Sequence, residues 1–522
     1  MKRRLFVKSL SAASLLLSQS PHSLGAQSME SLAPATATPS FMPDVEILLR
    51  AVVGEASLLE DSLTQVWRFS GELMKGQASA LSFLDGSGHI PIIRVRRGQK
   101  IRIHFENELP ESSIVHWHGL NIPQRMDGHP MYAIAPGERY VYEIAIDNRA
   151  GTYWFHPHPH ERTSFQVYQG LVGMLIVHDE EEGLAALPAA EHDIPLMIQD
   201  RSFSSDHQLE YIGPMRMNWM MGFSGDYVLV NGRVDYKRTV SRTAHRVRII
   251  NTSNASLYHL RWSDGRPFTV IATDGGLLER AREQSTLTLG VGERVEVWVD
   301  FSAFDAGDEM HLLAESYTPS LQNFTAEQGG RELQDGARPI ASFQFSAEAP
   351  VVGLPPQQLS QYAALSEDDA VNADSPRPVA ISMMRGSFYL NNRLFGAMQD
   401  VPEENRVKLG TTEVWEFKND SSMGMGMGRG MGGMMQMAHP MHVHNVQFKV
   451  LSRTRAGQEN TEHQQLSAGF TDYGLKDVVV VLPGETVRVL MKFENYTGIY
   501  LYHCHILEHE DLGMMQNFLI EA

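Results

Sequence analysis

The sequence predicts an all-β protein made of three related β-sandwich domains. Segments rich in β-branched and aromatic residues, separated by Gly, Pro and Asn, run through the chain with little helical periodicity. A strand that ends in Asn occurs three times, at residues 100–107, 246–251 and 413–419. Each is followed by a turn that ends in Gly-Glu, at residues 136–138, 291–293 and 483–485, so the turns are 155 and 192 residues apart. A spacing of that size is the period of a whole β-domain and not that of a solenoid.

The repeats divide the chain into predicted domains. A chain of 522 residues is too long for one ordinary core and favours two to four domains. We expect the domains at residues 42–185, 195–347 and 375–522, with a Pro- and Gln-rich linker at 350–374 before the third.

Residues 1–26 predict an export signal. Lys2, Arg3 and Arg4 precede a modest apolar stretch at 5–17, and a small-residue cleavage site follows at 24–26. The paired arginines resemble a twin-arginine signal, and an ordinary secretory signal is the alternative. Both predict export, and the twin-arginine interpretation places the mature protein in the periplasm.

Composition excludes several classes of protein. Apolar residues make up 43% and charged residues 20%, which is typical of a folded chain. No apolar run approaches the roughly 20 residues that a membrane span needs. The formal net charge of −18 argues against nucleic acid as a partner, because phosphate binding depends on Lys and Arg. The single cysteine, Cys504, excludes an intrachain disulfide.

Four His-x-His pairs predict a metal cluster between the first and third domains. The pairs are His116 and His118, His156 and His158, His442 and His444, and His503 and His505. Residues i and i+2 of a strand face the same side, so each pair directs two imidazoles at one point. Eight imidazoles buried without a metal would lack hydrogen-bond partners. Imidazole suits Cu, Zn, Fe and Ni, so the pairs alone leave the element open.

The last histidine pair encloses the cysteine and identifies the metal as copper. Cys504 faces the side of its strand opposite to His503 and His505. A blue-copper site uses two His, one Cys and a distant Met, and this set is available as His439, Cys504, His509 and Met514. Zinc has no redox chemistry that could use the covalent path from Cys504 to the neighbouring histidines.

These motifs resemble those of bacterial three-domain multicopper oxidases, the laccases and periplasmic cuprous oxidases built from cupredoxin folds. The resemblance spans essentially the whole mature chain and implies three cupredoxin-like Greek-key β-sandwich domains. It also implies four copper ions, with the type 1 ion in the blue site and a trinuclear cluster between domains 1 and 3. Carried over by position, the type 2 copper takes His116 and His442, one type 3 copper takes His118, His156 and His505, and the other takes His158, His444 and His503.

The resemblance implies roles for several further residues. Asp127 and Glu510 occupy places where the family keeps carboxylates near the cluster, and we expect them to deliver protons or to orient ligand imidazoles. We expect Glu508 and Asp511 to be ordinary polar positions. His129 and His160 are expected at the surface or behind the ligands.

A methionine-rich loop precedes the blue site. Its methionines are Met423, Met425, Met427, Met431, Met434, Met435 and Met437. Thioether sulfur prefers Cu(I), so the loop is a candidate Cu(I) docking segment, and a Gly/Met flap without a ligand is the alternative. Its position differs from that of the Met-rich insertion of the familiar cuprous oxidase. A second group, Met215, Met217, Met220 and Met221, could line the same site or belong to the core, with the core slightly favoured.

The resulting functional hypothesis is an oxidase, expected to be a monomer, that couples one-electron oxidation of cuprous ion, small phenols or aryl amines to reduction of dioxygen to water. A role in copper tolerance follows from cuprous oxidation. One alternative is a general laccase for which copper is only a cofactor. Another is a periplasmic protein that sequesters copper, although storage needs no electron path.

Overall fold

The computed structural model describes residues 32–212, 216–315, 337–362, 364–384, 387–396, 398–419, 437–456 and 461–522. Residues 34–522 form one compact unit. The predicted export signal at 1–26 lies outside the described residues and stays a prediction. No helix in the described part of the chain is long and apolar enough to cross a membrane.

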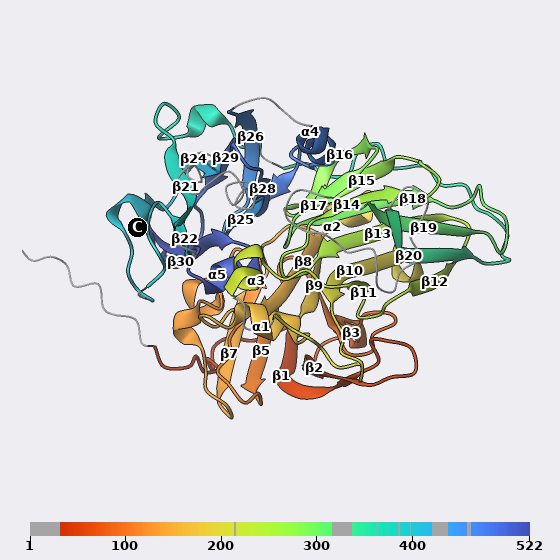
Figure 1. The fold of residues 1–522 in the computed structure, drawn as a ribbon, viewed down its shortest axis with the longest axis horizontal. Coiled ribbons are helices and arrows are strands. Elements are labelled where there is room, and N and C mark those ends of the chain that lie inside the picture. Colours follow the sequence, from red (N-terminus) through yellow and green to blue (C-terminus); the bar gives the residue numbers. More distant parts are fainter. Residues whose placement is uncertain are drawn as a thin grey trace, which may run out of the picture. The chain divides into compact units, whose positions relative to one another are not determined.

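Residues 45–178 form a first pair of sheets (Figure 1). One sheet has the order β2 (Thr64–Lys75), β1 (Val45–Ala56), β5 (Lys100–Asn107) and β7 (Arg139–Ala145). The other has the order β3 (Leu81–Phe83), β4 (Pro91–Arg96), β9 (Gly173–His178), β8 (Gly151–Pro157) and β6 (Val115–His118). Ile47 and Leu49 of the first sheet and Phe155 and Leu175 of the second are fully buried in one core. The two sheets therefore pack face to face as a sandwich.

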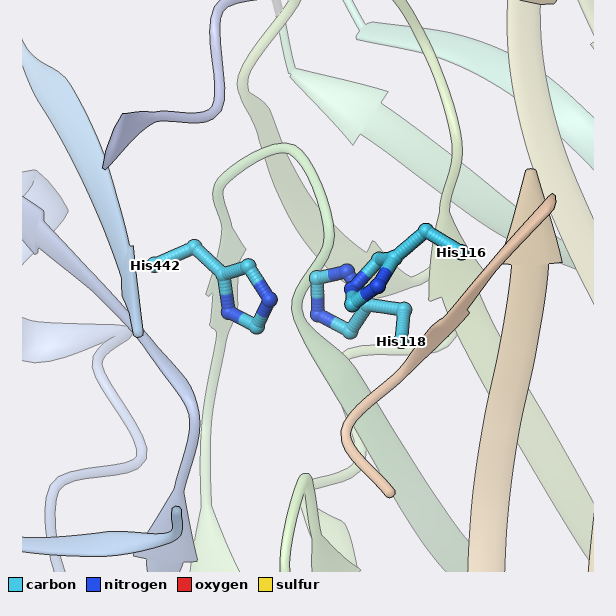
Figure 2. A group of neighbouring side chains, drawn as sticks. All are labelled: His116, His118 and His442. Atoms are coloured by element: carbon cyan, nitrogen blue, oxygen red, sulfur yellow. The ribbon is translucent and has the colours of Figure 1, made fainter. Parts of the chain in front are cut away.

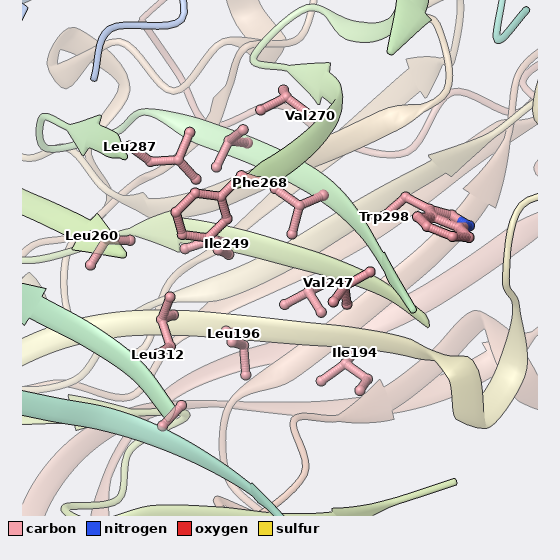
Figure 3. Close-up of a cluster of buried hydrophobic side chains, with 14 of the residues drawn as sticks. Ile194, Leu196, Val247, Ile249, Leu260, Phe268, Val270, Leu287, Trp298 and Leu312 are labelled. Atoms are coloured by element: carbon pink, nitrogen blue, oxygen red, sulfur yellow. The ribbon is translucent and has the colours of Figure 1, made fainter. Parts of the chain in front are cut away.

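A second pair of sheets follows at residues 193–345. One sheet has the order β11 (Tyr227–Val230), β10 (Asp193–Arg201), β13 (Ala244–Asn251), β18 (Arg294–Asp300), β15 (Phe268–Thr273) and β16 (Gly276–Gln284). The other has the order β12 (Tyr236–Val240), β20 (Ala337–Phe345), β19 (Glu309–Glu315), β14 (Tyr258–Trp262) and β17 (Leu287–Leu289). Figure 3 shows their shared core, in which Ile249 of β13 and Leu312 of β19 point toward the same apolar interior.

The third pair of sheets spans residues 377–521. One sheet has the order β22 (Ser387–Leu390), β21 (Arg377–Met384), β24 (Thr412–Asn419), β29 (Glu485–Lys492), β26 (Phe448–Arg455) and β27 (Leu475–Lys476). The other has the order β23 (Arg406–Lys408), β31 (Met515–Glu521), β30 (Gly498–Cys504), β25 (His439–Val443) and β28 (Val478–Val481). Cys504 and Met514 are buried in the core of this pair.

The described helices are short and lie in connections. The α-helices are α1 (Thr163–Tyr168), α2 (Glu180–Leu184), α3 (Arg216–Met221), α4 (Thr461–Ala468) and α5 (Leu507–Asp511). Single 3₁₀ turns occur at Ala78–Ala80, Gln124–Met126, Pro130–Tyr132, Ala190–His192, Glu367–Asp369 and Glu403–Asn405. Figure 1 shows α5 beside α3, and α5 also contacts α1. The prediction of an all-β fold is confirmed.

The repeated Asn has the same structural task in each pair of sheets. Asn107, Asn251 and Asn419 end β5, β13 and β24 and are all buried. Each amide donates to two backbone carbonyls of later segments. The backbone carbonyl of each Asn accepts from the backbone N–H of the glycine in the following Gly-Glu turn. A short polar side chain thus satisfies backbone groups that the strand end would leave unpaired, which explains why the motif occurs three times. The exact domain boundaries stay a prediction.

Candidate metal centre

The four His-x-His pairs lie on neighbouring strands of the first and third pairs of sheets. In the register of β6 with β8, His116 lies opposite His156. In the register of β25 with β30, His442 lies opposite His503. Figure 2 shows His442 facing His116 and His118 across the space between the two strand pairs. All eight histidines are at most 1% exposed.

Their ring nitrogens converge in three groups. The groups are His118 with His156 and His505, His158 with His444 and His503, and His116 with His118 and His442. Within each group the ligand atoms lie within 4.8 Å of one another. The first two groups are the sets expected for the type 3 ions, and the third contains both histidines expected for the type 2 ion.

Backbone carbonyls fix the orientation of half of these rings. His116 Nδ1 donates to the carbonyl of Asp127 at 2.7 Å, and His442 Nδ1 donates to that of Asp477 at 2.7 Å. His156 and His503 donate from Nδ1 to the carbonyl of the next residue, each at 2.9 Å. Because a neutral imidazole has one N–H, the Nε2 lone pairs of these rings face the shared interior.

His118 has the opposite orientation because of a carboxylate from the third pair of sheets. Its Nε2 donates to Asp477 Oδ1 at 3.0 Å, so Nδ1 faces inward and lies 3.2 Å from His505 Nε2. Ring orientation by a second hydrogen bond is typical of metal-ligating histidines.

The protonation of the group fits metal binding. Burial, together with the neighbouring imidazoles, lowers the pKa values of His118, His156, His158, His442, His444, His503 and His505, in the case of His503 to about 3. The Nε2 atoms of His116, His156 and His442 have no hydrogen-bond partner within the described residues. Unpaired buried polar atoms are costly, and a set of neutral, converging imidazoles is a donor set that suits copper.

A second group lies in the core of the third pair of sheets. His439, Cys504 and His509 bring their ligand atoms within 4.8 Å of one another. Cys504 Sγ lies 3.4 Å from His439 Nδ1 and 3.8 Å from His509 Nδ1. Burial raises the pKa of the Cys504 thiol, so a bound cation is needed to keep the thiolate at neutral pH.

The expected axial ligand is held beside this group by its backbone. Met514 is buried, its carbonyl accepts from Cys504 N at 3.1 Å, and its N–H donates to the His509 carbonyl at 2.9 Å. His509 Nε2 donates to the carbonyl of Met220 in α3 at 3.1 Å, which leaves Nδ1 facing the sulfur. Met220 and Met221 pack, partly buried, on the core that contains Cys504. Both therefore pack on this core, and Met220 contacts the site through its carbonyl, whereas Met215 and the Met217 side chain lie outside the described residues.

The two expected proton carriers both lie at the imidazole cluster. Asp127 is fully buried, and its Oδ2 accepts from His444 Nδ1 at 2.8 Å. Glu510 Oε1 lies 3.4 Å from His158 Nδ1, and its Oε2 lies 3.4 Å from His503 Nδ1. Burial and the nearby Asp511 raise the pKa of Glu510 well above its usual value.

The sequence interpretation missed an ion pair behind the cluster. Arg294 of β18, in the second pair of sheets, is fully buried and donates to both carboxylate oxygens of Asp477, at 2.5 and 2.6 Å. Asp477 in turn orients His118. These contacts join residues 183 and 359 positions apart, and no local pattern marks either residue.

Two expectations about nearby polar residues were wrong. Glu508 is fully buried and accepts from Tyr211 Oη at 2.6 Å and from Asn254 Nδ2 at 2.8 Å, so it is not an ordinary polar position. Asp511 accepts three hydrogen bonds from residues 163 and 164 at the start of α1. Of the two places expected for His129, the surface is excluded, because the residue is fully buried and hydrogen-bonded to Asn517.

The other residues singled out by sequence are only partly described. The His160 ring packs edge-on against Phe395 at 5.2 Å. Of the methionine-rich loop, residues 423–436 lie outside the described residues. Met437 is described and is 3% exposed, and its carbonyl accepts from Asn419 Nδ2 at 2.6 Å. Met437 is therefore part of the scaffold, and a Cu(I) docking role for its side chain does not account for this burial.

Comparison with known proteins agrees with this arrangement. Three family models, each described as multicopper oxidase, match residues 70–182, 206–322 and 371–522. The multicopper oxidase mco of Staphylococcus aureus is 31% identical over 448 residues, which cover 85% of each chain. The laccase of Bacillus subtilis is 29% identical over 82% of this chain and 87% of its own. The crystal structure of McoA multicopper oxidase from Aquifex aeolicus matches with a TM-score of 0.75 and 31% identity, over 92% of this chain and 97% of that one.

Proposed function

Because the chain belongs to the multicopper oxidase family, we propose that it holds four copper ions and uses dioxygen as the acceptor for one-electron oxidations. The family makes the protein a copper-dependent oxidoreductase. When bound, the coppers would supply one-electron chemistry, so that four electrons taken singly from substrate, together with four protons, reduce dioxygen to two waters. The observation that carries this proposal is Cys504, whose sulfur belongs to the sulfur group, while its covalent neighbours His503 and His505 each belong to a nitrogen group of the imidazole cluster.

The proposed ligand roles follow the three nitrogen groups and the sulfur group. Type 1 copper would be held by His439, Cys504, His509 and Met514; type 2 by His116 and His442; the type 3 pair by His118, His156 and His505 and by His158, His444 and His503. His118 belongs to two of the groups, and its inward Nδ1 lies nearest His505, which favours the type 3 assignment.

The chain's own contribution is to orient ligands, exclude water and move protons. Burial of all eight cluster histidines keeps bulk water out. Glu510 lies between His158 and His503, and burial raises its pKa, which favours the protonated carboxyl that a proton donor needs. The Asp127 carboxylate accepts a hydrogen bond from His444 Nδ1, and the Asp127 backbone carbonyl accepts one from His116 Nδ1. We assign proton delivery to Glu510 and to Asp127, which also orients ligand rings.

The proposed substrates are cuprous ion and small phenols or aryl amines, with copper tolerance as the physiological role. The soft sulfur of the methionine-rich loop, next to His439 in sequence, favours Cu(I) among these. We propose further that the chain acts as a monomer in the periplasm after twin-arginine export. A general laccase is the second candidate, and a copper-sequestering protein the third.

Oxygen uptake by the copper-loaded protein tests these candidates. Cu(I) and a simple phenol are supplied separately to the wild type and to a variant with Ser at Met423, Met425, Met427, Met431, Met434 and Met435. Met437 is left intact because it is buried. The matched control replaces Met42 and Met74, which are 68% and 55% exposed, by Ser.

Each outcome selects one candidate. Loss of Cu(I) turnover in the loop variant alone, with phenol turnover retained, supports cuprous docking. Unchanged rates with both substrates favour the general laccase. Copper binding without oxygen uptake from either substrate contradicts the oxidase and favours sequestration.

A further inference from the structure

A cavity of about 510 Å³ lies in the second pair of sheets and contains none of the proposed copper ligands. It is lined by the 3₁₀ turn at Ala190–His192, the end of β12, the start of β13 and residues 346–351. Two of its lining residues are histidines, His192 and His245. Neither histidine belongs to the proposed copper sites or to the proposed proton path.

The two imidazoles face each other at a separation typical of a shared metal ion. His192 Nδ1 lies 3.4 Å from His245 Nε2, and the ring planes are inclined at 81°. Hydrogen bonds donated by N–H cluster at about 2.9–3.0 Å, so 3.4 Å is long for one. Two nitrogens on a tetrahedral ion with bonds of about 2.0–2.1 Å are about 3.3–3.4 Å apart. The observed separation matches the distance between two nitrogens bound to one tetrahedral ion.

A backbone carbonyl directs one lone pair of His245 into the gap. His245 is 1% exposed and donates from Nδ1 to the Thr243 carbonyl at 2.9 Å, which leaves Nε2 unprotonated in the neutral ring. On the other side of the gap, His192 Nδ1 also lies 3.3 Å from Ser241 Oγ, a further polar atom at the gap. The exposed Glu191 carboxylate lies 3.7 Å from His192 Nε2, too far for a hydrogen bond but close enough for its charge to act on a bound cation. A carbonyl behind an imidazole, as at His245, is a usual support of a ligating histidine.

The charges around the pair have both signs, because Glu191 and Glu348 line the cavity together with two arginines, and the charge of Arg238 disfavours positive charge at His245. Arg238 and Arg242 line the same cavity, but their guanidinium groups donate elsewhere. Arg238 donates to Asp85 Oδ2 and to the Glu191 carbonyl, and Arg242 donates to the carbonyls of residues 304 and 348. The His192 side chain is 32% exposed, so the gap opens to solvent and water can complete the coordination.

We propose that His192 and His245 form a binding site for one divalent transition-metal ion of the Zn(II) or Cu(II) class, separate from the four copper positions. His192 lies in the connection between the first and second pairs of sheets, and His245 lies in β13. A bound ion therefore fastens that connection to the second pair of sheets. Because it binds the folded state, it raises the temperature of unfolding. Copper-loaded protein prepared with excess metal carries one more ion than the oxidase chemistry requires.

Titration of the copper-loaded protein with Zn(II) tests the site. Calorimetry measures the binding, and the unfolding temperature is measured with and without Zn(II). The variant is His192→Asn, and the matched control is His207→Asn. His207 is exposed and has a φ of 62°, a conformation that Asn adopts readily. We expect the wild type and His207→Asn to bind one Zn(II) more than His192→Asn, with at least a tenfold difference in affinity at that site. Only the first two proteins gain thermal stability from Zn(II), while oxygen uptake without Zn(II) is the same in all three.

Equal Zn(II) counts and equal Zn(II)-induced stabilisation in the wild type and His192→Asn would overturn the proposal. The same loss in His207→Asn would also overturn it, since the binding would then be general surface binding. Glu191→Gln is a second variant that cannot disturb folding, because Glu191 is 76% exposed. It should weaken Zn(II) binding several-fold, and an unchanged affinity would contradict the carboxylate support.

Discussion

Removing Arg294 should destabilise the folded protein and loosen the copper cluster together. The guanidinium is fully buried and pairs with both oxygens of Asp477. It also donates to the carbonyls of residues 152, 274 and 292. Arg294→Met retains much of the apolar volume but leaves a buried carboxylate without its cation. The carboxylate that orients His118 thereby loses both of its anchoring bonds.

The expected magnitude follows from this burial. Removing one partner of a buried ion pair costs about 3–5 kcal/mol, because the other charge stays desolvated. In a domain of 150–250 residues, 1 kcal/mol changes the unfolding midpoint by about 2–4 °C, so the midpoint should fall by about 6–20 °C. Asp477→Asn should cost less, because Arg294 keeps its three carbonyl acceptors and the amide oxygen can still accept from His118. In Arg294→Met/Asp477→Asn no unpaired charge remains, and the loss should be smaller than the sum of the single losses.

The assay is the unfolding midpoint of the copper-loaded variants, together with copper retained per chain after dialysis against a chelator. The matched control is Arg97→Met, which removes an ion pair whose side chains are 49% and 63% exposed. Such exposed pairs contribute about 0–1 kcal/mol. If Arg294→Met lowered the midpoint no more than Arg97→Met, or retained copper equally well, the positioning role of the Arg294–Asp477 pair would be refuted.

Three further predictions concern the ligands, the proton path and acid stability. The Cys504→Ser variant should lose the blue absorption and one copper ion, while the copper ions held by the eight cluster histidines are retained. A variant that stays blue would exclude Cys504 as the type 1 ligand. Glu510→Gln should retain copper but slow oxygen reduction by about 10²–10⁴-fold, the usual worth of a positioned proton donor, and an unchanged rate at full copper content would contradict the role. Burial alone would raise the pKa of Glu182, but the hydrogen bond with His178 and the charges of Arg246 and Arg248 lower it below its usual value of 4.5. A depressed folded-state pKa gives stability that is present above the unfolded-state pKa and is lost as the pH falls below it. The midpoint of the wild type should therefore exceed that of Glu182→Gln at pH 7, and the difference should shrink below about pH 4.5; a difference independent of pH would contradict the charge interaction.

Local sequence rules predicted the ligand groups well because the groups are local patterns. Strand residues two apart face the same side, so His116 and His118 were expected to point together. The same rule placed Cys504 on the opposite face from its neighbours. The three Asn-ended strands were likewise visible, because each reproduces one local set of backbone hydrogen bonds.

Residues that act across the chain could not be predicted in this way. Asp477 meets His118 across 359 positions, and Tyr211 meets Glu508 across 297. Polar residues are usually exposed, so the sequence predicts no special role for Glu508 and Asp511 beyond ordinary polar positions. Only the folded arrangement shows that both are buried and hydrogen-bonded. The partner of His129, Asn517, likewise lies 388 positions away, so the sequence leaves open whether His129 lies at the surface or behind the ligands.

The long-range contacts explain what the second pair of sheets contributes, although none of its described residues belongs to the imidazole cluster or to the sulfur group. Arg294 supports the carboxylate that orients His118, and the Met220 carbonyl fixes the ring of His509. Gly292, in the second Gly-Glu turn, has a φ of 85°, and a Cβ there would lie 3.1 Å from the His505 ring and 3.2 Å from that of His118. A side chain at that turn would press on two ligand rings, so the glycine serves both the turn and the close approach to the cluster. The middle repeat therefore has the turn but no His-x-His pair in its sequence, and it forms the wall against which ligands from the other two repeats are oriented.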